Sequence, residues 1–426
     1  MKLSWVQIMR LGLVQMCLGA IVVLTTSTLN RLMVVELALP AVLPGLLVAL
    51  HYSIQLSRPS WGHKSDTGGK RTRWIIGGMA ILALGGFLAA LGVPLLAANY
   101  ELGLTVSILA YALIGVGVGA SGTSLLALLA TATAPDRRAA AATITWLMMI
   151  FGIAFTATLV GKLLDPYSPA LLLKLVGAVC LIATALTSLA VWGVEEQVQA
   201  DRERDPTPFR EALTEVWAED RARRFTIFVF LSMTAYFMQE LILEPYAGLV
   251  FGLEPGETTS LSGAQNGGVF MGMLLVGIAA TGLKIGSLRN WVIAGCLGSA
   301  LTLAALSFIG TALIAPLLQP AVIALGFFNG MFAVAAIGSM MSLAGEGRNR
   351  SEGTRMGLWG AAQAIAAGFG GLTGATLVDL ARLYFTDASA FGAVFILEAL
   401  LFVFAAYLAI KVMDRTPVGA ALMPGE

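Results

Sequence analysis

Charged side chains are scarce in this sequence. Asp, Glu, Lys and Arg together make up 12% of the 426 residues, against about 25% in an ordinary soluble domain. Hydrophobic residues make up 58% of the chain, and its mean hydropathy is +0.84. The formal net charge is +1, so no excess of either sign points to nucleic acid as a partner. This composition is typical of a protein that crosses a membrane many times.

Cysteine and histidine are also rare, with three and two residues respectively. Cys17, Cys180 and Cys296 lie far apart in apolar runs, and no C-x-x-C or Cys/His metal spacing occurs, which argues against a zinc or redox site. The sequence contains no nucleophile–base constellation and no phosphate-binding loop. We therefore predict that the chain is not an enzyme.

Long apolar runs are abundant. A helix that spans the hydrocarbon core of a bilayer needs about 20 apolar residues. The sequence therefore predicts an all-α membrane protein with twelve transmembrane helices, near residues 11–33, 37–57, 74–97, 103–131, 139–161, 170–193, 225–250, 261–282, 290–311, 316–343, 356–379 and 391–411.

The positive charges predict the orientation of these helices. With the N-terminus in the cytoplasm, only four of the 26 Lys and Arg residues fall on outer segments, namely Arg31, Lys162, Lys174 and Arg382. The remainder fall on cytoplasmic segments, as the positive-inside rule requires. We expect a multi-pass protein of the bacterial inner (cytoplasmic or intracytoplasmic) membrane with both termini in the cytoplasm.

The longest polar interval separates the sixth and seventh runs and divides the chain into two halves of six helices. RTRWIIGG (71–78) in the first half is similar to LRNWVIAG (288–295) in the second, and GVGVG (115–119) is similar to GFFNG (326–330). Similar segments at equivalent places favour parallel repeats. The predicted organisation is an N-terminal half at 1–193, a cytoplasmic linker with an amphipathic helix at 194–224, a C-terminal half at 225–412 and a cytoplasmic tail at 413–426.

The loop between the second and third runs, RPSWGHKSDTGGKRTR (58–73), resembles the loop signature of the major facilitator superfamily. Gly62, Asp66, Gly69 and Arg71 occupy the positions of that motif, while Thr67 and Thr72 replace basic residues. Together with the layout, this resemblance implies a 6+6 pseudo-symmetric major facilitator fold. The fourth run has no arginine or acid within the membrane, which departs from the pattern of proton-coupled drug exporters in that superfamily.

Several segments resemble the PucC/LhaA family of light-harvesting complex assembly proteins, a branch of the same superfamily. LNRLMVVEL (29–37), SRPSWGHKSD (57–66) and LILEPYAG (241–248) carry the resemblance most clearly. APDRRAAAATITWLMMI (134–150) and RMGLWGAAQAIA (355–366) extend it along the chain.

The resemblance implies that the chain binds bacteriochlorophyll, or delivers it to antenna polypeptides in the membrane. Its implied partners are the light-harvesting α/β polypeptides, pigment-synthesis enzymes such as bacteriochlorophyll synthase, and the membrane insertion machinery. A carotenoid is a further conceivable cofactor. Two alternatives remain open: a secondary transporter of a small solute, which could be proton-coupled, and a pigment-free membrane scaffold that acts through segment 209–224.

His51 is the candidate axial ligand for the magnesium of such a pigment. It lies in the second run, and Gln55 and Arg58 follow it at i+4 and i+7 on the same helical face. The other histidine, His63, falls in the cytoplasmic loop. A histidine that is hydrogen-bonded within the helix bundle is the alternative interpretation of His51.

Glu240 and Glu244 lie in an otherwise apolar run, where each carboxylate costs about 2.5–3.5 kcal/mol near the bilayer centre. Arg31 lies at nearly the same height on the first run, so we expect an ion pair between Arg31 and Glu244, with Asn30 near Glu240. Pro245 predicts a helix break after Glu244. Three interpretations remain open for these residues: an interhelical gate or lock, a polar anchor for a pigment, and a proton-coupled transport site.

Overall fold

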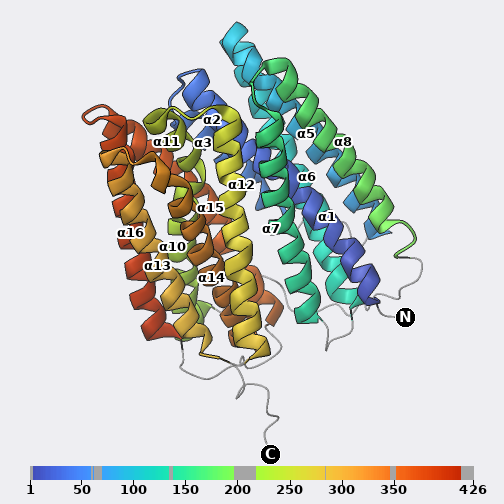
Figure 1. Cartoon of the computed structure of the whole chain (residues 1–426). Coiled ribbons are helices and arrows are strands. Elements are labelled where there is room, and N and C mark those ends of the chain that lie inside the picture. The colour runs from blue at the N-terminus through green and yellow to red at the C-terminus, as the bar shows by residue number, and fades with distance from the viewer. Residues whose placement is uncertain are drawn as a thin grey trace, which may run out of the picture. The chain divides into compact units, whose positions relative to one another are not determined.

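The computed structural model describes residues 3–58, 61, 70–133, 138–195, 217–283, 285–345 and 352–413. Secondary structure in these residues is helical throughout (Figure 1). Eleven helices are long and apolar enough to cross a membrane, and α3 (Val42–Gln55) is a shorter apolar helix. The chain is therefore an all-α, multi-pass membrane protein. The principal helices are α1 (Trp5–Val23), α5 (Arg71–Ala98), α6 (Tyr100–Ala132), α7 (Arg138–Leu163), α8 (Pro169–Val191), α10 (Asp220–Met238), α11 (Leu243–Phe251), α12 (Pro255–Val276), α13 (Leu288–Ala312), α14 (Leu318–Gly345), α15 (Glu352–Arg382) and α16 (Asp387–Val412).

The first span is longer than its apolar run predicts, because polar residues extend it at both ends. Ser4 and Gln7 form a reciprocal capping box that starts α1 at Trp5. Beyond Val23 the span continues through a π-helical segment η1 (Leu24–Thr28), the short α2 (Leu29–Arg31) and a second π-helical segment η2 (Leu32–Glu36). Residues 34–36, which lie between the first two predicted runs, are therefore helical. π-Helical turns are rare and often mark functional sites.

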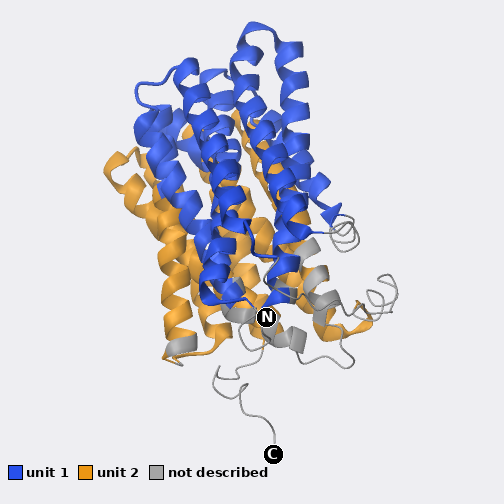
Figure 2. Cartoon of the chain, turned by 90° about the vertical axis from the view of Figure 1, so that its right-hand side faces the viewer, with its two compact units in different colours: residues 1–204, 243–263 blue, residues 205–242, 264–426 orange. Residues whose placement is uncertain are grey.

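Close packing divides the described chain into two compact units (Figure 2). Unit 1 consists of residues 1–204 and 243–263, and unit 2 of residues 205–242 and 264–426. Segment 243–263, which contains α11 and the start of α12, thus packs with the helices of the first half. The predicted domain boundaries remain a prediction.

Glycines allow the helices of unit 1 to approach closely. α5 packs along α6, where a Cβ at Gly78 would lie 2.5 Å from the backbone nitrogen of Ser121. α7 meets α12 in the same way: a Cβ at Gly161 would lie 2.5 Å from the backbone nitrogen of Ser260. Small residues at contacts replace the hydrophobic driving force that is weak within a bilayer.

Unit 2 is assembled by the same device. A Cβ at Gly272 of α12 would lie 2.0 Å from the backbone oxygen of Phe327 on α14, and one at Gly295 of α13 would lie 2.6 Å from the backbone nitrogen of Phe332. A Cβ at Gly374 of α15 would lie 2.6 Å from the backbone oxygen of Met238 on α10. The high glycine content therefore serves helix contacts in both units.

Candidate functional site

The C-terminal part of the first span, from Thr25 to Arg31, presents an unusually polar buried face in unit 1. All seven residues from Thr25 to Arg31 are buried. The hydroxyls of Thr25 and Thr26 donate to the carbonyl of Val22, and the Tyr111 hydroxyl donates to the carbonyl of Thr25 at 2.8 Å. A π-helical segment leaves carbonyls without a regular partner, and these side chains satisfy some of them.

Hydroxyl pairs join this face to the start of α12. Ser27 Oγ lies 2.9 Å from Ser262 Oγ, and Thr259 Oγ1 donates to Thr28 Oγ1 at 3.1 Å. Both pairs are buried. Buried polar groups need partners, so these two pairs hold the segment around Thr259 and Ser262 against the first span within unit 1.

Glu244 lies beside these hydroxyls, on α11. Its side chain is 2% exposed, and neither carboxyl oxygen has a hydrogen-bond partner among the described residues. The hydroxyls of Ser27 and Ser262 and the guanidinium of Arg31 are the polar groups that act on the carboxyl. Glu244 is therefore a buried acid that faces two hydroxyls and a cation.

The helix break lies before Glu244, and the prediction that it follows Glu244 was wrong. α10 ends at Met238, a 3₁₀ turn η4 spans Gln239–Leu241, and α11 begins at Leu243. Pro245 thus occupies the first turn of α11, where the missing N–H would have no helical partner in any case. The break separates Glu240, which is half-buried in unit 2, from Glu244 in unit 1.

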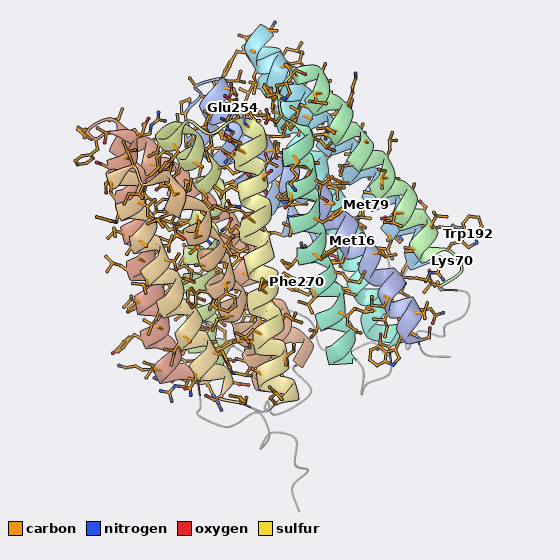
Figure 3. All side chains as sticks on the ribbon, in the orientation of Figure 1. Met16, Lys70, Met79, Trp192, Glu254 and Phe270 are labelled. Carbon is orange, nitrogen blue, oxygen red and sulfur yellow. The ribbon has the colours of Figure 1, made fainter. Side chains whose placement is uncertain are left out.

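Arg31 is 2% exposed and pairs with Glu36, so the predicted ion pair with Glu244 is not formed. Its Nη1 donates to Glu36 Oε1, its Nη2 donates to the carbonyl of Leu253 at 2.6 Å, and its Nε has no partner among the described residues. The π-helical segment explains the choice of partner, because its i→i+5 pattern brings residues five apart to one side of the helix. Figure 3 shows Glu254, the residue after Leu253, at the turn between α11 and α12.

Gly248 allows Arg31 to lie against α11. A Cβ at Gly248 would be 3.3 Å from both Nε and Nη2 of Arg31. Glu244 is one turn earlier on the same face of α11, just as Ser27 is one turn before Arg31. Glu244 and Gly248, against which Arg31 lies, are therefore about 6 Å apart along the axis of α11.

Tyr167 lies near Arg31 and Glu36, in the connection between α7 and α8. Burial raises the pKa of Tyr167, the negative charge of Glu36 raises it further, and the positive charge of Arg31 acts in the opposite sense. The phenol therefore stays neutral next to the Arg31–Glu36 pair. We refer to Ser27, Arg31, Glu36, Glu244 and Ser262 as the unit 1 polar cluster.

His51 is hydrogen-bonded within α3, as the alternative interpretation held. His51 Nε2 lies 2.9 Å from Gln55 Nε2, and Gln55 Oε1 accepts from Arg58. Since the Gln55 amide nitrogen is a donor, Nε2 is the acceptor, and the neutral ring carries its proton on Nδ1. Nδ1 has no partner among the described residues. The chain Arg58–Gln55–His51 thus occupies the only basic nitrogen of the ring.

The remaining predicted site residues are less informative. Asn30 is buried in unit 1, so Asn30 and Glu240 belong to different units. Gly62, Asp66 and Gly69 of the loop motif lie outside the described residues, as do His63 and residues 209–216 of the predicted amphipathic helix.

Arg71, the last residue of the loop motif, begins α5 and is held there by a residue that sequence reasoning missed. The Glu195 carboxylate accepts from the backbone N–H groups of Arg71 and Thr72 at 2.9 and 3.0 Å, and from the Thr72 hydroxyl. A carboxylate at a helix N-terminus stabilises the helix. Figure 3 shows Lys70 and Trp192, at the start of α5 and the end of α8, at the same end of unit 1.

Comparison with known proteins places the chain in a family. The model of the family described as "PUCC protein" matches residues 28–416. The chain belongs to the PUCC protein family. A protein of Rhodobacter capsulatus named "Bacteriochlorophyll synthase 44.5 kDa chain" is 66% identical over 425 residues, which are 100% of this chain and 99% of that relative. A "Protein PucC" of the same species is 30% identical over 441 residues, covering 96% of this chain and 92% of the relative.

Solved structures show that this PUCC protein has a major facilitator fold. The nucleoside transporter NupG aligns with a TM-score of 0.72 at 14% identity, over 97% of this chain and 100% of NupG. A bacterial homologue of the lysosomal transporter Spinster aligns with a TM-score of 0.66 at 15% identity, over 95% and 96% of the two chains. At such low identity the likeness concerns the fold alone, and it confirms the predicted fold class.

Proposed function

We propose that this PUCC protein assists the assembly of light-harvesting complexes by binding bacteriochlorophyll and delivering it to antenna polypeptides. The observation that carries the proposal is the full-length, 66% identical relative named for bacteriochlorophyll synthesis. A chain that works beside pigment synthesis and has a transporter fold is suited to hold a membrane-soluble pigment.

The unit 1 polar cluster is the part of the described chain that fits such a pigment best. A bound chlorin would supply a magnesium ion, and hard oxygen ligands suit magnesium. Among the described residues, neither buried carboxyl oxygen of Glu244 has a partner in hydrogen-bond geometry, and the Nε–H of Arg31, a donor suited to a carbonyl, has none either. His51 fits less well, because Gln55 engages its basic nitrogen.

The same geometry favours the pigment anchor over the lock. A lock requires a direct bond between Glu244 and Arg31, but Arg31 bonds to Glu36 and Leu253 instead. The Glu244 carboxyl is thereby left available to a ligand. Glu240, on the other side of the helix break, is a second candidate that the same experiment tests.

The partners and location follow from the proposed role. We propose that the chain works in the bacterial inner membrane with both termini in the cytoplasm. It would receive pigment from bacteriochlorophyll synthase and pass it to antenna α/β polypeptides, in contact with the insertion machinery. A carotenoid is a further ligand to look for in the purified protein. The chain itself would carry out no chemical reaction.

Complementation of a deletion strain tests this function. In a photosynthetic host that lacks its own copy, we expect antenna absorbance to fall and to return with the wild-type gene. Glu244→Gln should restore it only partly at normal protein level, whereas Glu240→Gln should restore more. Bacteriochlorophyll synthesis in the membranes should persist without the chain; its loss would instead make the chain a required part of the synthase. Normal antenna yield in the deletion strain would contradict the proposal.

The second candidate function is secondary transport of a small solute. The likeness of the fold to NupG and to the Spinster homologue favours it. Uptake into proteoliposomes of a labelled solute, without any effect of the deletion on antenna yield, would support it. The scaffold alternative would be supported by normal antenna assembly with a variant unable to bind pigment.

A further inference from the structure

Unit 2 contains a second buried acid that the proposed function does not use. Glu398 lies near the middle of α16, is 0% exposed, and has no hydrogen-bond partner for either carboxyl oxygen among the described residues. Its carboxyl group is removed from solvent, and no charged side chain among the described residues acts on it. A buried carboxyl without a charged partner is costly unless a hydrogen bond or a bound cation satisfies it.

Asn329 of α14 is a second incompletely paired group in the same unit. It is 0% exposed, and its Oδ1 accepts a hydrogen bond of 2.8 Å from Ser299 Oγ on α13, while its Nδ2 has no partner among the described residues. Ser299 is also 0% exposed. Three neighbouring helices thus each contribute one fully buried polar side chain.

Packing contacts place these three side chains at one level. Phe332 of α14 and Phe402 of α16 make an edge-on ring contact with centroids 6.0 Å apart. Asn329 precedes Phe332 by three residues and Glu398 precedes Phe402 by four, so each lies about one turn earlier on the same helical face. Since α14 and α16 are joined through a single helix, they run in the same direction, and both polar residues lie on the same side of the aromatic contact.

The third helix agrees with this register. α13 runs antiparallel to α14, because Gly295 lies against Phe332 while Gly298 lies against Phe328. Ser299 is therefore level with Asn329, to which it is bonded. α13 also packs on α16, where a Cβ at Gly392 would lie 2.7 Å from Ser307 Oγ. α13 and α16 run in opposite directions. Six residues after Gly392 on α16 is Glu398, and six residues before Ser307 on α13 is position 301, so Glu398 lies at a level between Ser299 and Thr302.

We infer that Glu398, Asn329 and Ser299 form a site for a small monovalent cation, either a proton or a sodium ion. The carboxylate supplies the charge, and the amide and hydroxyl oxygens supply hard oxygen ligands of the kind that such cations prefer. Rotation of the Asn329 amide by half a turn exchanges its oxygen and nitrogen, so that Nδ2 donates to Ser299 and Oδ1 turns to the cation.

No other charge of the neighbouring helices substitutes for this cation. The helices that pack most extensively on α16 are α13, α10 and α15, and α14, which has no charged residue, touches it through Phe332. In the parts whose side chains are described, their charged or titratable residues are Arg289 and Cys296 on α13, Asp220, Arg221, Arg223, Arg224 and Tyr236 on α10, and Asp379 and Arg382 on α15. None of them acts on the Glu398 carboxyl.

Labelling with dicyclohexylcarbodiimide tests the site in the full-length protein in liposomes. This apolar reagent adds to protonated carboxyl groups: the acid proton goes to a carbodiimide nitrogen, the carboxylate oxygen bonds to the central carbon, and the acyl group then shifts to nitrogen. We expect the adduct on the peptide that contains Glu398, resolved by mass spectrometry from any adduct at Glu244. Glu398→Gln should lose the first adduct and keep the second.

Two arms distinguish the cations. For a sodium site, sodium at about ten times its Kd leaves about a tenth of the sites free, so labelling should fall about tenfold, whereas potassium should not protect. Asn329→Leu should remove this protection. For a proton site, sodium should have no effect and labelling should fall as the pH rises. Absence of the Glu398 adduct at every pH in sodium-free buffer, with the Glu244 adduct present, would overturn the inference.

Discussion

Replacement of Arg31 and Glu36, singly and together, tests the charge arrangement of the unit 1 polar cluster. The side chain of Arg31 is 3% exposed and that of Glu36 is 37% exposed, so the two partners differ in their access to solvent. Glu36→Gln removes the anion and leaves a buried guanidinium without a charged partner. Breaking a buried pair in this way costs about 3–5 kcal/mol. We expect about 3 kcal/mol, since the amide oxygen of glutamine still accepts a hydrogen bond.

Arg31→Met should be the milder change. It leaves Glu36 able to regain water, and its main cost is the unpaired carbonyl of Leu253, about 1–2 kcal/mol. The double variant should cost no more than Arg31→Met alone, because no charge remains buried. Reversible unfolding in mixed micelles, followed by tryptophan fluorescence or circular dichroism, measures all three free energies.

Which of the two single variants loses more unfolding free energy decides this prediction. If Arg31→Met is the more destabilising, or if the two costs simply add in the double variant, the pair does not act as described. A fourth variant, Glu36→Gln with Glu244→Gln, adds a further check when Glu244→Gln alone is also measured. A cost greater than the sum of the two single costs would indicate that Glu244 replaces Glu36 as the partner of Arg31.

Other predictions concern the helix contacts of unit 1. Gly161→Ala should destabilise the protein by about 1–3 kcal/mol, because the new Cβ meets the backbone of Ser260 at 2.5 Å; Gly77→Ala, which meets nothing within 4 Å, is the matched control and should be neutral or stabilising. Glu195→Ala should cost about 1–2 kcal/mol and speed hydrogen exchange at the start of α5, since it removes the cap, and unchanged exchange there would refute that role. Tyr111→Phe should cost about 1 kcal/mol through loss of its bond to the first span, measured by the same unfolding assay.

The positions of the eleven long helices in the described residues could be predicted because their hydrophobic runs have the length that a bilayer requires, whereas the second predicted run, 37–57, contains only the shorter α3. The ends were less predictable, since polar groups determine them. The first span begins at Trp5 through the Ser4–Gln7 capping box and continues to Glu36 through π-helical turns, neither of which changes the hydropathy of the run. A run of four hydroxyl residues, Thr25–Thr28, was the available signal for this irregular segment.

The candidate site could be found from the sequence only in part. Glu244 and Arg31 were identifiable because ionisable groups within apolar runs are costly and therefore few. Their partners depend on three-dimensional details: the π-helical turn that directs Arg31 to Glu36, and the break at Ile242 that places Glu244 in unit 1. Ser262 lies in a segment with no distinguishing motif, and only the packing of the helices identified it. Glu398 carries the same signal as Glu244, an acid within an apolar run, but only the packing shows which polar groups lie at its level.

The absorption spectrum of the protein purified from a bacteriochlorophyll-producing host is the most direct test of pigment binding at Glu244. We expect a stoichiometric chlorin band in the wild type, retained in His51→Leu and lost or strongly reduced in Glu244→Leu, with equal protein yield and equal elution on size exclusion. Absence of the band from the wild type, or its loss in the His51 variant alone, would refute pigment binding at Glu244.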